Sequence, residues 1–234
     1  MILTRDEHQA LLSVTTATLT TVMLKKGVSN VWIRGAFPLR AGQSRVVGPA
    51  FTMRFIPARD DLSTPESLAS ATSTRTAIEA MPDGCIAVVA ADGCHDAGIF
   101  GDILCERMKQ RHVQAVVTDG VIRDLEGVLE TEMPVWAAGA AAPPSFSGLT
   151  FVGWNDPIGC GGAAIFPNDI IVADKDGAVI IPQAMVSDVC AAAIEQEKME
   201  GWILEQVRSG TPLPGLYPPN EDNKARYEAW KKSE

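Results

Sequence analysis

Apolar side chains near the start of the chain recur at three- and four-residue steps, which is the spacing of an amphipathic helix. Leu19 and Met23 lie on this apolar stripe, and Gly27 supplies a stop signal after it. The pattern predicts one helix over residues 6–25, although several threonines between residues 15 and 21 have low helix propensity.

Two more segments with regular patterns come before the middle of the chain. Residues 45–54 alternate in the manner of a strand and are rich in strand formers, with one Gly-Pro interruption. Residues 66–81 have helical spacing and end at the turn signal Pro82-Asp83-Gly84. One strand and then one helix are therefore expected here.

The middle of the chain alternates between short apolar runs and segments with helical spacing. Continuous apolar runs at residues 85–91, 115–118 and 134–136 predict buried strands. A helix is predicted over residues 101–111, and a helix or turn over residues 124–130. Strands that alternate with helices are typical of a layered α/β domain, so we expect a mixed α/β fold.

The last hundred residues follow a different sequence pattern. Residues 137–162 are rich in Gly, Pro, Ala and Ser and are expected to form loops. Residues 165–182 predict two strands joined by a tight turn at residues 174–177. A long amphipathic helix is predicted over residues 185–207, and the Pro-rich chain after Gly210 is expected to run extended.

Length and composition point to one main domain. The chain has 234 residues, and 46% of them are hydrophobic, which is enough for a sizeable core. We expect a single domain over residues 1–210 and a Pro-rich C-terminal extension over residues 211–234.

The acidic balance of the chain disfavours some classes of partner. A net charge of -9 at pH 7 is unfavourable for a surface that must meet nucleic-acid phosphates or an anionic membrane. No apolar run approaches the roughly 20 residues of a membrane span, and the charged N-terminus does not resemble a signal peptide. The five cysteines are scattered without Cys-x-x-Cys spacing, as free thiols in a reducing compartment are. We therefore expect a cytoplasmic protein without nucleic-acid or membrane partners.

The first candidate site is the stretch DAGIFGDILCERM, residues 96–108, where a glycine-bearing loop leads into a helix. The first turn of a helix has unsatisfied N–H groups and a partial positive charge, so it can bind a carboxylate or phosphate. Gly101, Asp102, Ile103 and Leu104 occupy that turn. The alternative is that these residues only start a helix, with Asp102 favoured there by the helix dipole.

The second candidate site is the stretch AVVTDGVIRDLEGV, residues 115–128. A buried strand ends at the turn Asp119-Gly120, and Arg123 and Asp124 follow it. Ligand sites in open α/β sheets lie beyond the carboxyl ends of strands. An arginine there can grip a carboxylate with two hydrogen bonds, and an aspartate can hold a hard divalent cation. The alternative is a surface ion pair, which contributes little free energy.

The two stretches resemble the RraA-like family, together with the runs PVWAAG and GCGGAAIFPNDIIVADKDGAVIIP that follow them. The resemblance extends over residues 45–182. This family includes divalent-metal-dependent 4-hydroxy-4-methyl-2-oxoglutarate / 4-carboxy-4-hydroxy-2-oxoadipate aldolases and regulators of ribonuclease E. The resemblance implies a phosphohistidine-like swivelling β/β/α fold in one catalytic domain, and a homotrimer or hexamer with sites between subunits.

The aldolase branch of this family is similar in having an aspartate in the loop before the helix, here Asp102. The resemblance implies that Arg123 binds the carboxylate or oxo oxygen of a 2-oxo acid and that Asp124 holds Mg²⁺ or Mn²⁺. It also implies that Asp102 orients or activates a water that protonates the product enolate. The backbone N–H groups that it implies as carboxylate donors are those of Gly101, Ile103 and Leu104.

A further implied residue is a glutamate from the late helix of a neighbouring subunit. Glu200 is the better match in this chain, and Glu197 is a close competitor. The chain departs from the family in having His112 where a glycine is common after the helix, and in its longer Pro-rich tail. These departures leave the natural substrate open.

The chemistry that the resemblance implies is carbon–carbon bond cleavage beside a 2-oxo group. Such cleavage leaves negative charge on a pyruvate enolate, which a divalent cation and Arg123 can stabilise. The implied activity is a lyase that releases pyruvate from a small hydroxylated 2-oxo acid. Oxaloacetate decarboxylation is expected from the same site, because it passes through the same enolate.

One alternative mechanism and one alternative function differ from this interpretation. A Schiff-base mechanism needs a desolvated lysine, whereas Lys109 and Lys175 are expected to be exposed to solvent. The other alternative is a non-catalytic RraA-type regulator of ribonuclease activity, which rests on family membership alone. The regulator branch lacks the Arg-Asp pair, so the presence of the pair favours the enzyme.

Overall fold

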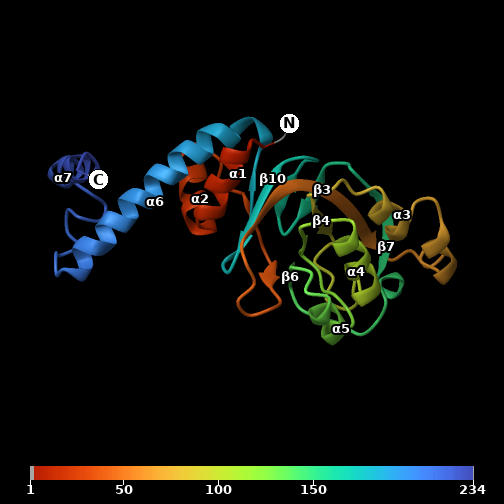
Figure 1. Cartoon of the computed structure of the whole chain (residues 1–234). Coiled ribbons are helices and arrows are strands. Elements are labelled where there is room, and N and C mark those ends of the chain that lie inside the picture. The colour runs from red at the N-terminus through yellow and green to blue at the C-terminus, as the bar shows by residue number, and fades with distance from the viewer. Residues whose placement is uncertain (1–2, 234) are drawn as a thin grey trace.

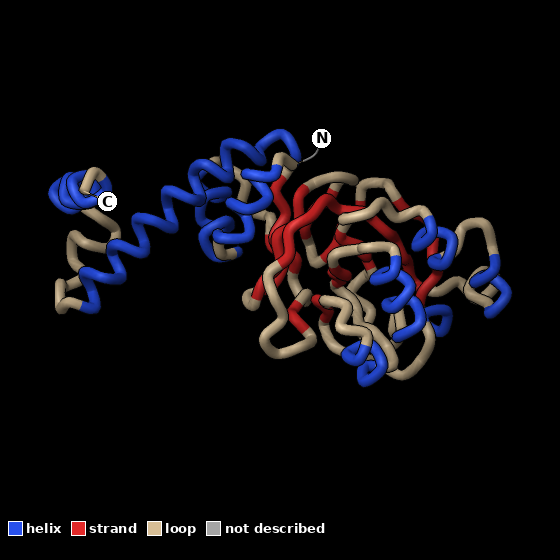
Figure 2. The backbone as a smooth tube through the Cα atoms, in the orientation of Figure 1, coloured by secondary structure: helices blue, strands red, loops and turns tan. Residues whose placement is uncertain are grey.

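Four parallel strands form the middle of a mixed sheet, which is built mainly from the apolar runs of the sequence. In order they are β3 (Val46–Pro57), β4 (Ile86–Ala90), β5 (Ala115–Thr118) and β6 (Val135–Ala137). The computed structural model describes residues 3–233, and Figure 2 shows the sheet at the centre of the molecule. All residues of β4 and β5 are buried, as expected of parallel strands that are covered on both faces.

Antiparallel strands extend the sheet on both sides of this parallel part. The hairpin of β10 (Ile170–Asp174) and β11 (Gly177–Ile181) pairs with β3, which confirms the predicted pair of strands. β1 (Trp32–Ile33) pairs with β11, and β2 (Phe37–Pro38) pairs with β6 at the other edge. The sheet therefore runs β1-β11-β10-β3-β4-β5-β6-β2, with β7 (Leu149–Trp154) also paired to β3.

Different elements cover the two faces of the parallel strands. On one face lie α3 (Thr74–Glu79), α4 (Asp102–Gln110) and α5 (Leu125–Glu130), over a core that includes Phe100 and Met108. A second core on the sheet includes residues of the pair β8 (Ile158–Cys160) and β9 (Ala163–Ile165) and the fully buried Trp136. The indole of Trp136 donates to the carbonyl of Asp174 at 2.6 Å, so its one polar group is satisfied.

The first helical segment of the chain is two helices rather than one. α1 (Arg5–Ser13) and α2 (Thr16–Lys25) are separated by extended backbone at Thr15, whose hydroxyl accepts from the N–H of Thr18 at 3.1 Å. The prediction of a single helix over residues 6–25 is therefore wrong. A threonine hydroxyl competes for backbone N–H groups and favours the cap position over the helix interior.

The prediction of one helix over residues 66–81 is also wrong. The chain forms a 3₁₀ turn, η1 (Pro65–Ala69), and then the short helix α3. Ser73 is the N-cap of α3, and its hydroxyl accepts from the N–H of Thr76 at 3.3 Å. The extended backbone at Ser70 and Ser73 separates the two pieces.

Residues 137–162, expected to form only loops, contain regular structure. β7 and β8 (Ile158–Cys160) lie in this segment, and β8 pairs with β9 (Ala163–Ile165). Gly153 in β7 has a φ of 154°, which glycine adopts without the strain that a side chain would bring. The glycines and prolines of residues 137–162 led to the loop prediction, because both residue types are rare in strand interiors.

The long helix α6 (Val186–Arg208) confirms the prediction over residues 185–207. The prediction of extended chain after Gly210 is wrong. α7 (Glu221–Lys231) follows and folds back on the C-terminal part of α6. These two parts stand out from the body of the molecule, whereas the start of α6 packs against α1 and α2 (Figure 1). Trp202, Leu216 and Tyr227 are buried where the two meet. The division of the chain at residue 210 stays a prediction.

The cysteines of the chain are free thiols. Burial raises the pKa of Cys85 to about 12, and burial also raises the pKa of Cys105 to about 12. Thiols with such pKa values are protonated near neutral pH and are poor nucleophiles. Over residues 3–233, none of the helices has both the length and the apolar character that crossing a membrane requires.

Candidate active site

A cavity of about 320 Å³ lies where the start of α4 meets the turn after β5. Its volume is at the lower end of the roughly 300–1,000 Å³ that is usual for ligand sites, so it suits a small metabolite. It brings the two candidate stretches together, although they were identified separately along the chain. The predicted site residues that line it are Gly101, Asp102, Ile103, Leu104, Arg123 and Asp124.

The two stretches meet because β4 and β5 are neighbouring parallel strands whose continuations also pair. Gly98 forms a parallel bridge with Val121, and the N–H of Ile99 donates to the carbonyl of Val121 at 2.9 Å. The N–H of Arg123 then donates to the carbonyl of Phe100 at 2.9 Å. This ladder fixes Arg123 beside the loop that leads into α4.

Two glycines make this close approach possible. A Cβ at Gly98 would lie 2.6 Å from the backbone nitrogen and from the Cβ of Arg123. A Cβ at Gly101 would lie 2.7 Å from the Oδ2 atom of Asp124. Real Cβ atoms do not come so near other heavy atoms. A side chain at Gly98 would therefore push the two stretches apart, and a side chain at Gly101 would displace the Asp124 carboxylate.

We expect Gly98→Ala to destabilise the fold by about 1–3 kcal/mol, the usual cost of overpacking a tight contact. The added methyl group meets the backbone of Arg123, which cannot rotate away as a flexible side chain can. Urea unfolding of purified protein measures the change. Gly159→Ala is the matched control, because a Cβ at Gly159 has no neighbour within 4 Å in residues 3–233. Equal stability of both variants would contradict the close contact.

Arg123 and Asp124 form a local ion pair on the cavity wall. The Nε atom of Arg123 donates to Oδ2 of Asp124 at 3.1 Å, and the side chains are 36% and 48% exposed. Such an exposed pair contributes little to stability. Its geometry has another consequence: in residues 3–233 the terminal nitrogens of Arg123 have no hydrogen-bond partner, which leaves a two-nitrogen fork for a ligand carboxylate.

Asp124 holds a backbone conformation that few side chains adopt. Its φ of 52° and ψ of 48° lie in the left-handed region, where it precedes α5 as the N-cap residue. This conformation costs a non-glycine residue on the order of 1 kcal/mol. Strain of this kind is concentrated at functional sites, because the surrounding structure must hold it in place.

The start of α4 offers both N–H groups and a carboxylate. Gly101 is the N-cap and has no side chain with which to satisfy the first-turn N–H groups. The Oδ1 atom of Asp102 accepts from the N–H of Ile103 at 2.8 Å. The N–H of Ile103 is therefore free for a ligand only after the Asp102 carboxylate turns, whereas Leu104 needs no such change.

The acidic side chains of the cavity suit a divalent cation that takes most of its ligands from water and substrate. Among residues 3–233, there is no group of three or more His, Cys, Asp and Glu side chains that could hold a metal without other ligands. Asp124 and Asp102 offer hard oxygen ligands on the cavity wall. Mg²⁺ keeps several waters and needs only one or two carboxylates together with substrate oxygens, and Mn²⁺ accepts the same ligands. The donor set therefore fits Mg²⁺ or Mn²⁺ and does not fit a protein-enclosed metal.

The two glutamates of α6 differ in what already engages them. Glu197 accepts from the N–H of Thr15 at 2.7 Å and from its hydroxyl at 2.9 Å, so it anchors the start of α2. Within the described residues, Glu200 accepts only from the amide of Gln196, at 2.6 Å. Neither lines the cavity of its own chain, and the part of α6 that carries Glu200 leads away from the sheet (Figure 1).

Two further residues on the cavity wall were not predicted from the sequence. Arg75 at the start of α3 and Ser145 in η2 (Ser145–Ser147) both line it. They were missed because the first lies in a segment read as continuous helix, and the second lies in a segment read as featureless loop. The one usable signal was Ser73 followed by Thr74, which can start a helix just before Arg75.

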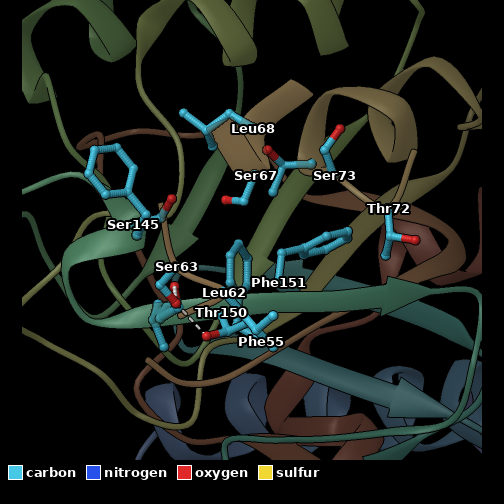
Figure 3. Close-up of a pocket in the computed structure, with 13 residues that line it drawn as sticks. Phe55, Leu62, Ser63, Ser67, Leu68, Thr72, Ser73, Ser145, Thr150 and Phe151 are labelled. Carbon is cyan, nitrogen blue, oxygen red and sulfur yellow. Dashed lines mark hydrogen bonds between the residues drawn. The ribbon is translucent and has the colours of Figure 1, made fainter. Parts of the chain in front are cut away.

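A second hollow adjoins the first and shares Leu68 and Ser145 with it. Figure 3 shows Ser67, Leu68 and Ser73 above the rings of Phe55 and Phe151. Its volume of about 30 Å³ has room for about one or two water molecules and none for a metabolite. The cavity that Arg123 and Asp124 line is therefore the candidate substrate site.

The lining of this cavity does not support a Schiff-base mechanism. The lining contains no lysine from residues 3–233. Lys109 donates to the carbonyl of Thr131 and lies 3.8 Å from a carboxylate oxygen of Glu132, while Lys175 is exposed. A Schiff-base lysine needs a desolvated position, whereas Lys109 and Lys175 are both exposed.

The chain is similar to proteins of one family. A family model described as RraA-like, Aldolase/RraA, matches residues 16–180. A protein of Halalkalibacterium halodurans, named "Putative 4-hydroxy-4-methyl-2-oxoglutarate aldolase", is 30% identical over 154 residues, which are 65% of this chain and 67% of that protein. Protein DlpA of Legionella pneumophila is 27% identical over 176 residues, 75% of this chain but only 28% of that protein, so the chain corresponds to part of it.

Solved structures share the fold. RraAS2 of Streptomyces coelicolor, described as an unusual member of the RNase ES inhibitor RraA protein family, superposes with a TM-score of 0.77 at 29% identity and covers 86% of this chain and 96% of its own. An uncharacterized protein from Pseudomonas syringae pv. tomato has a TM-score of 0.78 at 24% identity, over 92% of this chain and 98% of its own. At that identity the second likeness concerns the fold alone. The mixed α/β architecture predicted from the sequence is confirmed.

Proposed function

The chain belongs to the RraA-like family (Aldolase/RraA), and from this premise we propose that it is a divalent-metal-dependent lyase acting on hydroxylated 2-oxo acids. It cleaves a carbon–carbon bond by a retro-aldol reaction and releases pyruvate. The observation that carries the proposal is that Arg123, Asp124 and the first turn of α4 share one cavity of metabolite size. The name of the Halalkalibacterium halodurans relative supports it.

Substrate binding follows from the free donors of the cavity. The Nε atom of Arg123 stays with Asp124, and the two terminal nitrogens grip the substrate carboxylate. Backbone N–H groups of Gly101 and Leu104 add donors from the first turn of α4. Ile103 contributes its N–H once Asp102 releases it.

Asp124 is the residue that would hold Mg²⁺ or Mn²⁺, with waters and substrate oxygens as the remaining ligands. When bound, the cation supplies Lewis-acid stabilisation of the negative charge that the broken bond leaves on the pyruvate enolate. Arg123 places a fixed positive charge beside the same oxygens without reorganisation during the reaction. Oxaloacetate loses CO₂ through the same enolate, so decarboxylation belongs to this site as well.

Asp102 and Glu200 are proposed as the residues that handle protons. Once the Asp102 carboxylate has turned away from the N–H of Ile103, its oxygens position the water that protonates the enolate carbon. Glu200 would act on the site of a neighbouring subunit, because it lies outside the cavity of its own chain. A homotrimer or hexamer, the swivelling β/β/α type of fold, and a catalytic domain over residues 1–210 with an extension over residues 211–234 are parts of this proposal.

Metal dependence is the direct test of the function. Purified protein with oxaloacetate and Mg²⁺ is expected to release pyruvate, EDTA to stop the release, and added Mn²⁺ to restore it. Pyruvate is measured with a coupled dehydrogenase. Mg²⁺ with heat-denatured protein is the control for decarboxylation in solution. Release that is unchanged by EDTA, or absent with every hydroxylated 2-oxo acid tried, would overturn the proposal.

A non-catalytic regulator of ribonuclease activity is the second candidate. The likeness to RraAS2, which is described as a member of an RNase ES inhibitor family, favours it. A pull-down with a ribonuclease of the E type and a cleavage assay with and without this protein would test it. Inhibition by a protein that turns over no 2-oxo acid would replace the enzyme proposal.

A further inference from the structure

A separate cavity of about 430 Å³ lies at the end of the sheet that β1 forms, beside α2 and the turn between β10 and β11. We call it the β1 cavity, and its lining includes Trp32, Arg34 and Asp176. In Figure 1, α2 lies beside β10, away from α4 and α5. Among residues 3–233, the β1 cavity and the candidate active site share no lining residue. Its volume is in the usual range for small-molecule sites, so it is a second candidate binding site.

Arg34 supplies the positive charge of the β1 cavity. Its Nη1 atom donates to the carbonyl of Gly161 at 3.2 Å and to Oδ1 of Asn30 at 3.3 Å, which holds the side chain in place. Within residues 3–233, its Nε and Nη2 atoms have no hydrogen-bond partner, and its guanidinium has no ion-pair partner. Nε and Nη2 lie on one side of a guanidinium and together can grip a carboxylate with two parallel hydrogen bonds.

Asp176 supplies the negative charge, from the turn between β10 and β11. Its N–H donates to Oδ1 of Asp174 at 3.0 Å, and its carbonyl accepts from the indole of Trp32 at 3.3 Å, so its backbone is fixed. In the part of the chain that the structure describes, its carboxylate has neither a hydrogen-bond donor nor an ion-pair partner, and it does not pair with Arg34. One cavity therefore has two unpaired charges of opposite sign on its wall.

Trp32 gives the β1 cavity an aromatic wall, and the buried Val179 adds apolar surface. A Cβ at Gly177 would lie 2.7 Å from the indole nitrogen of Trp32, so the glycine leaves room for the ring. A Cβ at Gly162 would lie 2.7 Å from Nη1 of Arg34. The absence of side chains at these two positions allows the ring and the guanidinium to lie beside the same cavity.

The pattern of charges favours a ligand that carries both signs. A ligand with only negative charge would be repelled by the Asp176 carboxylate, in a chain whose net charge is -9. A ligand with only positive charge would be repelled by Arg34. An α-amino acid has a carboxylate and an ammonium group on one carbon, so it can satisfy both residues at once. An aromatic side chain on that carbon would gain from contact with the ring of Trp32.

We propose that the β1 cavity is a binding site for a free aromatic α-amino acid. The Nε and Nη2 atoms of Arg34 bind its carboxylate, and the Asp176 carboxylate accepts from its ammonium group. Trp32 contacts its ring. This site is separate from the proposed lyase chemistry, and it takes no part in bond cleavage.

Four probes separate the contributions of the three groups. L-Phenylalanine has all of them, 3-phenylpropanoate lacks the ammonium group, 2-phenylethylamine lacks the carboxylate, and L-alanine lacks the ring. Their affinities for the purified full-length protein are measured by isothermal titration calorimetry. L-Phenylalanine is expected to bind with a Kd of about 1 mM, about tenfold more tightly than each of the other three, the effect of one exposed charge-assisted hydrogen bond or one ring contact.

Substitutions should each remove the preference for one group. Arg34→Ala is expected to weaken L-phenylalanine about tenfold and leave 2-phenylethylamine unchanged, because that probe has no carboxylate to lose. Asp176→Asn should weaken L-phenylalanine by a similar factor without weakening 3-phenylpropanoate. Lys175→Ala is the matched control, since it removes an exposed charge from the same turn that does not line the cavity. Equal melting temperatures verify that each variant folds.

Three results would overturn the inference. One is the absence of L-phenylalanine binding at about 10 mM, well above the expected Kd. Another is equal affinity for 3-phenylpropanoate or 2-phenylethylamine in the wild-type protein, which would mean that one of the two charges is not recognised. The third is the same loss for all four probes in Arg34→Ala or Asp176→Asn, because a general distortion has no preference among them. A protein without lyase activity can still give the expected pattern, so this test does not depend on the proposed function.

Discussion

Asp124→Asn is expected to lower metal-dependent pyruvate release about a thousandfold, which corresponds to about 4 kcal/mol of lost transition-state stabilisation. Asparagine keeps the shape of the side chain and can adopt the same left-handed backbone at φ 52°. It removes the charge that the cation requires, while its amide oxygen can still accept from the Nε atom of Arg123. The rate is measured with oxaloacetate at saturating Mg²⁺.

A second measurement separates metal binding from other causes of the loss. Titration with Mn²⁺, followed by electron paramagnetic resonance in the presence of pyruvate, should reveal a bound ion in the wild-type protein and none in Asp124→Asn. Glu126→Gln is the control, because Glu126 is an exposed acidic residue two positions further on that does not line the cavity. An active Asp124→Asn variant would show that the metal assignment is wrong.

Arg123→Ala is expected to lower kcat/KM about a hundredfold or more, the usual effect of removing a donor that stabilises developing negative charge. Arg123→Lys should recover only part of the loss, because an ammonium cannot present the planar two-nitrogen fork. Free guanidinium ion added to Arg123→Ala should restore some activity by occupying the vacated space. Steady-state rates with oxaloacetate measure all three effects.

The control for this loss is another arginine with a local aspartate partner. Arg59 binds Asp61 at 2.7 Å, and both side chains are well exposed outside the cavity. Arg59→Ala therefore removes an exposed Arg–Asp pair of similar type and should leave the rate unchanged. Wild-type activity in Arg123→Ala would mean that the pair with Asp124 is only a surface ion pair.

The middle strands could be predicted because burial on both faces leaves a simple trace in the sequence. The apolar runs at residues 85–91, 115–118 and 134–136 correspond to β4, β5 and β6 within one or two residues. Parallel strands covered on both sides need apolar residues at every position. The glycines and the Arg-Asp pair that follow these runs predicted the two stretches of the candidate site, because each signal lies within a few residues of a strand end.

The helix boundaries failed where a cap competed with an apolar stripe. Thr15 and Ser73 each lie inside a segment with helical spacing, yet their hydroxyls accept backbone N–H groups and start new helices. The prediction for the tail was wrong in the opposite way, because it missed a helix that is present. Its prolines suggested extended chain, although Asn220 before Glu221 and Asp222 is a start signal for α7.

Periodicity and turn residues, taken from the chain alone, were enough to define the buried strands, α4 and the two polar stretches that follow the strands. These features depend on neighbours a few residues away, so they leave a local pattern. Only the folded arrangement decided that Arg75 joins Arg123 and Asp124 at one cavity and that Glu200 lies outside it. Which distant segments share a cavity depends on sheet order and on the path of the connecting chain, and no local pattern encodes either of these.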